Sequence, residues 1–145
     1  MFNLQIALNR FFEQFTPLVF TEGYAMVKDA QGNMSPPGEP YITYGYSTSD
    51  IFVNTLLTFQ IWVPNASNFQ AALEIAGKIE KTIPVGIGTQ LSIYDLDPAS
   101  GEKLSDKALG AVMLYRGTPF IQPRSMDDQS LVVYYGNIEM RSHLI

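Results

Sequence analysis

The 145-residue sequence contains no cysteine and a single histidine, His143. These absences exclude a disulfide framework, a thiol nucleophile and a zinc site built from Cys and His ligands. No apolar run approaches the roughly 18 residues that a membrane-spanning helix requires. We therefore expect no membrane partner for this chain.

Charge is also scarce, since Lys and Arg number 9, Asp and Glu number 14, and together they make up 16% of the chain. Soluble domains usually carry about 25%. The net charge of −5 argues against wrapping nucleic acid, which needs clustered Lys and Arg. A surface poor in charge is typical of subunit interfaces. With 46% hydrophobic residues, residues 1–145 suit a single domain with its own core.

Two amphipathic helices are predicted. Apolar residues recur at helical spacing over residues 2–15, and Pro17 ends that segment. Ser67 and Gln70 have capping-box spacing at the start of a second helix, over about residues 68–82. Its core side is predicted to consist of Phe69, Ala72, Leu73, Ala76, Ile79 and Ile83.

Extended segments are predicted at residues 18–28, 41–46, 51–63, 91–94, 109–116 and 131–144. Within 51–63, period-2 alternation places Val53, Thr55, Leu57, Phe59 and Ile61 on the core face. Gly117-Thr118-Pro119 is expected to end the strand before it. Because helices and strands do not alternate along the chain, we predict an α+β fold with a mostly antiparallel, mixed sheet and helices on one face.

Two motifs that resemble ligand-binding loops are better explained as turns. Gly86-Ile87-Gly88 lacks the Lys-Ser/Thr of a Walker loop and the third glycine of a dinucleotide loop. Asp95, Asp97 and Glu102 resemble a calcium loop, but Ala99 and Ser100 occupy positions that the calcium pattern assigns to Asp or Asn and to Gly. We therefore predict no metal site and no cofactor.

Catalysis has no positive support in the sequence. His143 lies two residues from the end of the sequence, and no Gly-x-Ser-x-Gly nucleophile motif is present. Asp127 and Asp128 are adjacent and are best explained as part of a solvated loop. We predict that the protein is not an enzyme, with an unrecognised hydrolase using His143 and an Asp as an alternative.

Aromatic side chains point to burial between subunits. Tyr41, Tyr44, Tyr46, Phe52, Phe59 and Trp62 fall within 22 residues. A sheet that is covered on one face only cannot bury aromatics from both of its faces inside one protomer. The residues predicted to contact other subunits or partners are Tyr44, Tyr46, Phe52, Trp62, Pro119, Phe120 and Gln122.

The order of the segments adds a family resemblance. Residues 36–44 (PPGEPYITY) lead into a strand, a long strand ending at Trp62 precedes a capped helix that holds residues 75–79, and residues 115–123 precede Asp127-Asp128 and a closing strand. In this order they resemble bacteriophage tail terminator and tail-completion proteins, which are also classed as minor tail or minor capsid proteins. The resemblance covers roughly residues 36–145.

This resemblance implies a tail-terminator-like fold that assembles as a hexameric ring. Such a ring caps the head-proximal end of the tail tube, ends tube polymerisation and provides the head–tail joining surface. The implied partners are other copies of the chain, the major tail tube protein and a head–tail connector or neck protein, and genomic DNA passes through the lumen without specific binding. The implied location is the virion tail or neck, and the host cytoplasm during assembly. The alternatives are another phage neck or head-completion ring protein, and a module that binds a small ligand or a peptide.

Two aromatic residues are predicted to matter more for assembly than for folding. Trp62→Ala and Phe120→Ala should impair ring or tube formation more than protomer stability, because Trp62 lies on the less apolar strand face and Phe120 lies in a proline-flanked segment. Thermal unfolding and assembly are to be measured side by side. Equal losses in both would identify the two residues as ordinary core.

Overall fold

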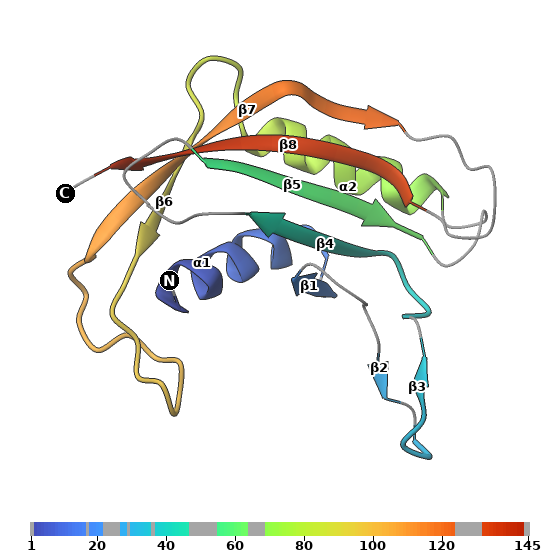
Figure 1. Ribbon diagram of the computed structural model, residues 1–145, viewed down its shortest axis with the longest axis horizontal. Coiled ribbons are helices and arrows are strands. Elements are labelled where there is room, and N and C mark those ends of the chain that lie inside the picture. Colours follow the sequence, from blue (N-terminus) through green and yellow to red (C-terminus); the bar gives the residue numbers. More distant parts are fainter. Residues whose placement is uncertain are drawn as a thin grey trace.

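The computed structural model describes residues 2–16, 18–21, 27–28, 30–35, 37–46, 55–63, 69–123 and 132–143. Its α+β architecture is a curled sheet with two helices (Figure 1). The elements are α1 (Phe2–Glu13), β1 (Val19–Thr21), β2 (Val27–Lys28), β3 (Met34–Ser35), β4 (Tyr41–Tyr46), β5 (Thr55–Trp62), α2 (Phe69–Thr82), β6 (Thr89–Ile93), β7 (Gly110–Pro123) and β8 (Val132–His143). The predicted fold class is confirmed.

The main sheet has six strands in the order β1-β4-β5-β8-β7-β6. β1 runs parallel to β4, and the remaining pairs are antiparallel. The mostly antiparallel, mixed sheet is therefore as predicted. β2 and β3 form a separate two-stranded ribbon. No helix in the described part of the chain is long and apolar enough to cross a membrane.

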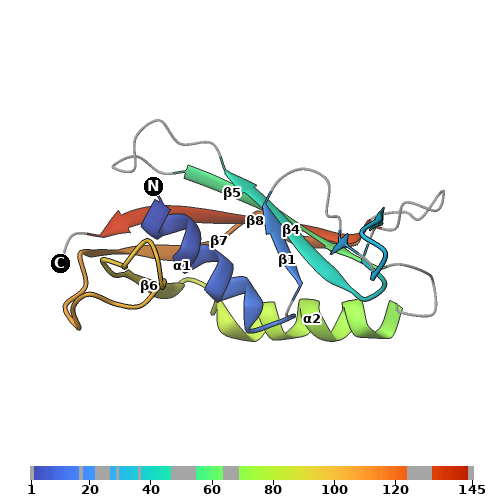
Figure 2. The ribbon, with the colours of Figure 1, turned by 90° about the horizontal axis from the view of Figure 1, so that it is seen from below.

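Both helices pack on the same face of the sheet and share one hydrophobic core (Figure 2). Phe12 of α1 is its centre, because its ring stacks on Tyr44 with centroids 5.0 Å apart and lies 5.8 Å from the ring of Phe59. Ile79 of α2 is also fully buried. Burial of this face supplies the main apolar driving force for folding.

Gly136 of β8 lets the sheet approach this core closely. A Cβ atom at this position would lie 2.4 Å from Cζ of Phe59 and 2.8 Å from the carbonyl oxygen of Phe120. A side chain cannot be accommodated at these distances without moving the neighbouring strands. The glycine thus leaves room for the Phe59 ring beside the strand.

The alternation predicted for β5 is correct over the described residues. Thr55, Leu57, Phe59 and Ile61 are buried, whereas the residues between them are exposed or half-buried. Val53, which the same alternation places on this face, lies outside the described residues.

The predicted end of β7 is wrong. The strand continues through Gly117, Thr118 and Pro119 to Pro123, although its register with β8 shifts between Arg116 and Ile121. Proline is tolerated in strands at such irregularities, because no ladder hydrogen bond is required there. Asn137 secures the irregular segment by donating from Nδ2 to the carbonyl of Pro119 at 2.9 Å.

The bounds of α2 are close to those predicted, and four of the six predicted core residues (Ala72, Ala76, Ile79 and Ile83) are buried, but Phe69 and Leu73 are not. Ala72, Ile75, Ala76 and Ile79 are buried, whereas Phe69 is 43% and Leu73 is 45% exposed. Apolar residues lie on more than one side of this helix, so spacing alone could not choose its rotation. The side of α2 that contains Ala72 and Ala76 faces the sheet, because these small side chains allow the helix to approach it closely.

This rotation gives a matched pair of substitutions on one helix. Ile79→Ala is expected to lower the free energy of unfolding by about 2–5 kcal/mol, because it leaves a cavity in a fully buried site. Leu73→Ala is expected to change it by less than about 1 kcal/mol, because nearly half of this residue is exposed to solvent and its removal leaves no enclosed cavity. Urea unfolding of both variants checks the pair, and equal losses would contradict the orientation of α2.

Candidate interaction surface

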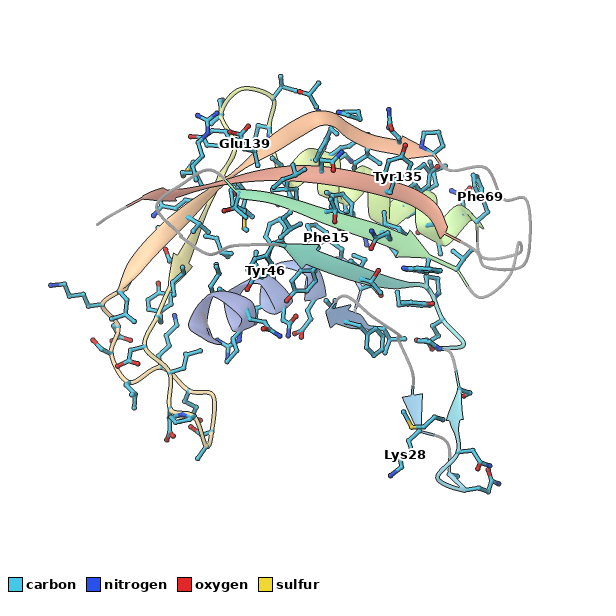
Figure 3. The ribbon with its side chains drawn as sticks, viewed as in Figure 1. Phe15, Lys28, Tyr46, Phe69, Tyr135 and Glu139 are labelled. Atoms are coloured by element: carbon cyan, nitrogen blue, oxygen red, sulfur yellow. The ribbon has the colours of Figure 1, made fainter. Side chains whose placement is uncertain are left out.

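The face of the sheet opposite the helices carries no described helix, and we call it the open face. Strand alternation and register assign its side chains. It comprises Tyr41, Thr43, Leu56, Thr58, Gln60, Trp62, Met113, Tyr115, Gln122, Tyr135, Asn137, Glu139 and Arg141. Leu56 is 55% and Tyr135 is 37% exposed. Tyr135 and Glu139, both from β8, are labelled in Figure 3.

A row of polar side chains crosses four strands of the open face. The register places Gln122 of β7 beside Tyr135 of β8, then Gln60 of β5, then Thr43 of β4. The hydroxyl of Tyr135 donates to Oε1 of Gln122 at 2.6 Å, and that of Thr43 donates to Oε1 of Gln60 at 2.7 Å. Their orientations are thus fixed inside the protomer.

An aromatic group lies beside this row. The indole of Trp62 and the ring of Tyr41 are stacked with centroids 5.7 Å apart and planes 2° from parallel. The Phe20 ring contacts Tyr41 edge-on at 5.9 Å. Nε1 of Trp62 donates to Oγ1 of Thr43 at 2.8 Å, so the aromatic group and the polar row are connected.

Charge among the open-face residues named above is confined to one pair. Nη2 of Arg141 lies 3.0 Å from Oε1 of Glu139, and its guanidinium lies over the ring of Tyr115 at 4.7 Å. The open face therefore combines low charge, an exposed leucine and tyrosine (Leu56 and Tyr135) and polar groups already held in position, whereas Tyr41 and Thr43 in β4 are buried by their neighbours. These are features of surfaces that bind other proteins with little ordering cost.

Three of the residues predicted at interfaces lie on or near this face. Trp62 and Gln122 belong to it, and Pro119 is exposed in the irregular part of β7. Phe52 lies outside the described residues.

Three other predicted residues lie on the covered face, against the core: Tyr44, Tyr46 and Phe120. Tyr44 is only 1% exposed and belongs to the core, so it has no surface to offer a partner. Tyr46 and Phe120 are half-buried against that core. The physical reason is strand parity, because Tyr44 and Tyr46 pair with Phe59 and Leu57 on the covered face. Tyr44 is therefore removed from the predicted set.

Burial also changes the chemistry of Tyr44. Its hydroxyl is hydrogen-bonded to Oδ1 of Asn9 and lies 3.3 Å from the carbonyl oxygen of Gln5. Desolvation, with smaller contributions from Tyr46 and Glu13, raises the pKa of this phenol far above its usual value. The group is a buried donor that links α1 to β4.

The two loop motifs form turns, as predicted. Gly86 and Gly88 have φ values of 77° and 70° in the turn before β6. Asp97 accepts a hydrogen bond from the amide of Ala99 at 2.9 Å, as in an Asx turn. Among the described residues, no group of three His, Cys, Asp or Glu side chains could hold a metal ion.

The side chains of the remaining catalytic candidates lie outside the described part of the structure. His143 ends β8 opposite Ala111, and its side chain lies outside the described part. Asp127 and Asp128 also lie outside the described residues.

A second feature is a groove of about 480 Å³ between α1 and β6. Ile6, Ala7 and Phe11 of α1 line one side, and Leu91 lines the other, with Leu96 beyond the strand. Arg10 and Lys103 also line it. Nη2 of Arg10 donates to the carbonyl of Gly101 at 2.9 Å, and Nζ of Lys103 lies 3.7 Å from the centre of the Tyr94 ring. The groove has the size of a ligand or peptide pocket.

Sequence reasoning missed Leu56, Tyr135 and Gln60 as members of the candidate surface. Alternation along β5 indicated that Leu56 and Gln60 share a face with Trp62, but it could not show which residues of β8 lie beside them. That information is in the register between strands distant in sequence.

No family model, no curated protein and no solved structure matches this chain in comparisons of its sequence and fold.

The raised pKa of Tyr44 predicts a pH-dependent loss of stability. Above about pH 10 the unfolded chain releases phenolic protons that the folded chain retains, so the free energy of unfolding falls as pH rises. Tyr44→Phe should cost about 1 kcal/mol at neutral pH, where it loses a hydrogen bond, and should make the alkaline fall shallower.

Urea unfolding at pH values from about 8 to about 11 measures both effects. The pKa values of Tyr41 and Tyr46 are also raised by burial, so the fall should be reduced and not abolished. An unchanged pH dependence in Tyr44→Phe would contradict the assignment.

Proposed function

We propose that this chain is a structural protein of a phage tail that forms a ring at the head-proximal end of the tail tube. In this role it ends tube polymerisation and provides the surface to which the head is joined. The ring is hexameric, as the resemblance of residues 36–145 to tail terminator proteins implies. The chain acts without catalysis or cofactor.

The observation that carries this proposal is the open face. A protomer in a ring that is stacked between two other rings needs wide surfaces that make repeated, head-to-tail contacts. The open face carries one ion pair and an exposed leucine. Its polar and aromatic side chains are already held in place by hydrogen bonds and ring stacking within the protomer. These properties favour contact with other protein chains over contact with water alone.

The fold and charge of the protomer are compatible with this role. The protomer is an α+β fold with a mixed sheet and helices packed on it, and the resemblance implies an α+β fold of this general kind. The net charge of −5 would favour a lumen that repels the phosphates of passing DNA. The partners are other copies of the chain, the major tail tube protein and the head–tail connector, and the location is the virion tail, after assembly in the host cytoplasm.

The groove between α1 and β6 favours a second candidate, a module that binds a small ligand or a peptide. A ligand module should act as a monomer and should leave tail assembly unaffected when it is removed. A different neck or head-completion ring protein would leave tails of correct length that fail to join heads.

Electron microscopy of tails assembled without this protein separates the candidates. The terminator role predicts tubes of abnormal, variable length that do not join heads. Tubes of normal length that join heads normally would end the proposal. Normal tubes without heads would favour the neck protein.

Leu56→Lys tests the role of the open face without disturbing the protomer. The introduced ammonium group would lie opposite Glu139 in the β5–β8 pair, so the fold should remain stable. A charge introduced into a contact surface should abolish tube capping. Leu109→Lys, at a position that is 61% exposed in the loop before β7, is the matched control. Capping that survives Leu56→Lys, or that is lost equally in both variants, would exclude the open face as the contact surface.

A further inference from the structure

The strand β6 lies at one edge of the main sheet, and its outer side has no strand partner in the described part of the chain. The sheet order ends at β6, which is paired with β7. In an antiparallel pair, alternate residues direct their N–H and C=O groups to the neighbouring strand, and the residues between them direct theirs away from it. A free edge of this kind is a template for an added strand.

The groove between α1 and β6 follows this edge. Four consecutive residues of β6 line it: Thr89, Gln90, Leu91 and Ser92. Successive side chains of a strand point to opposite faces of the sheet. A groove that reaches all four residues in a row therefore runs along the edge of the strand and not over one of its faces. The sheet curls so that α1 lies alongside β6 and forms the opposite wall (Figure 2).

The groove is positively charged although the chain is acidic. Arg10 and Lys103 line it, and none of the other described residues that line it is acidic. Asp and Glu outnumber Lys and Arg by 14 to 9 in the whole chain, so the groove holds a local excess of positive charge. Among the described residues neither cation has a carboxylate partner, since the ion pair found there joins Arg141 and Glu139.

Both cations are held at the groove by neutral groups. Nη2 of Arg10 donates to the carbonyl of Gly101 at 2.9 Å, and Nζ of Lys103 lies 3.7 Å from the centre of the Tyr94 ring. A guanidinium has five N–H donors and an ammonium has three. Because both side chains are exposed, donors remain for a ligand, and a carboxylate is the group that complements them best.

Apolar surface is also accessible in the groove, although it is the smaller part of the lining. Phe11 and Leu96 are buried and offer little of it, whereas Ile6, Ala7 and Leu91 are half-buried. A volume of about 480 Å³ is within the range of sites that bind small ligands. The lining therefore suits a short segment that has main-chain groups, carboxylates and a few apolar side chains.

We infer that the α1–β6 groove binds an extended, acidic segment of a partner protein, which adds to the edge of β6 as a further strand. Main-chain hydrogen bonds to β6 supply affinity, as in other complexes formed by strand addition. Arg10 and Lys103 select carboxylates through charge-assisted hydrogen bonds. None of the groove residues belongs to the open face. The inference therefore goes beyond the role in the tail and does not depend on it.

NMR titration of the purified chain with synthetic peptides tests the ligand class. The capped pentapeptide EVEVE should bind. The capped peptide KVKVK reverses the charge, and EVEVE with methylated amide nitrogens cannot donate main-chain hydrogen bonds. Both should bind at least about 10-fold more weakly than EVEVE. No binding of EVEVE at millimolar concentration, or equal binding of either control peptide, would overturn the inference.

Two double variants test the cations. Arg10→Gln/Lys103→Gln should weaken the binding of EVEVE by at least about 10-fold. Lys78→Gln/Lys107→Gln removes the same charge at exposed positions outside the groove, so it is the matched control and should bind as the unaltered chain does. Thermal unfolding checks that both variants are folded. Equal weakening in the two variants would assign the effect to net charge and overturn the selection of carboxylates by the groove.

Amide hydrogen exchange locates the bound peptide. Saturation with EVEVE should slow exchange of the outward-facing amides of β6, Thr89–Ile93, and should leave residues 104–107 unchanged. Three results would overturn strand addition by a partner: binding without protection of β6, binding of N-acetylglutamate amide as tight as that of EVEVE, and protection of β6 by self-association without peptide. The second would assign the groove to a small carboxylate and the third to another copy of the chain. The tail-assembly test is read on tubes and is decided separately.

Discussion

The structure depends on the burial of one face of a curled sheet beneath two helices. Phe12 of α1, stacked on Tyr44 and adjacent to Phe59, fixes where the first helix crosses the sheet. Ile79 fixes the second helix on the same face. Both helices pack on one side, and no described helix covers the open face. The low charge and internal hydrogen bonds of that face favour contact with another chain.

The open face offers the proposed ring a wide contact area of low charge on one side of the curled sheet. The scarcity of charge, 16% of the chain, is therefore a property of specific surfaces and not a general deficit. The ion pair of the open face, between Glu139 and Arg141, lies near the C-terminal end of β8.

Much of this fold could be predicted from local patterns, and the rest depended on long-range packing. The alternation in β5 correctly selected Leu57, Phe59 and Ile61 for the core, because one face of that strand is clearly more apolar. β4 has aromatic residues on both faces, so its sequence could not show that Tyr44 points inward and Tyr41 outward. The rotation of α2, which exposes Leu73, and the continuation of β7 past Pro119 are likewise set by neighbouring elements. The open face could be predicted in part from β5, but its polar row needed the registers of β4, β7 and β8.

The central claim is that the open face becomes buried when copies of this chain assemble. Hydroxyl-radical footprinting of the free protein and of assembled rings or capped tubes measures this directly at Leu56 and Tyr135, which are 55% and 37% exposed in the protomer. The account predicts strong protection of both side chains on assembly, with Leu104 in the loop before β7 still labelled. Equal labelling of Leu56 and Tyr135 in the free and assembled protein would contradict it.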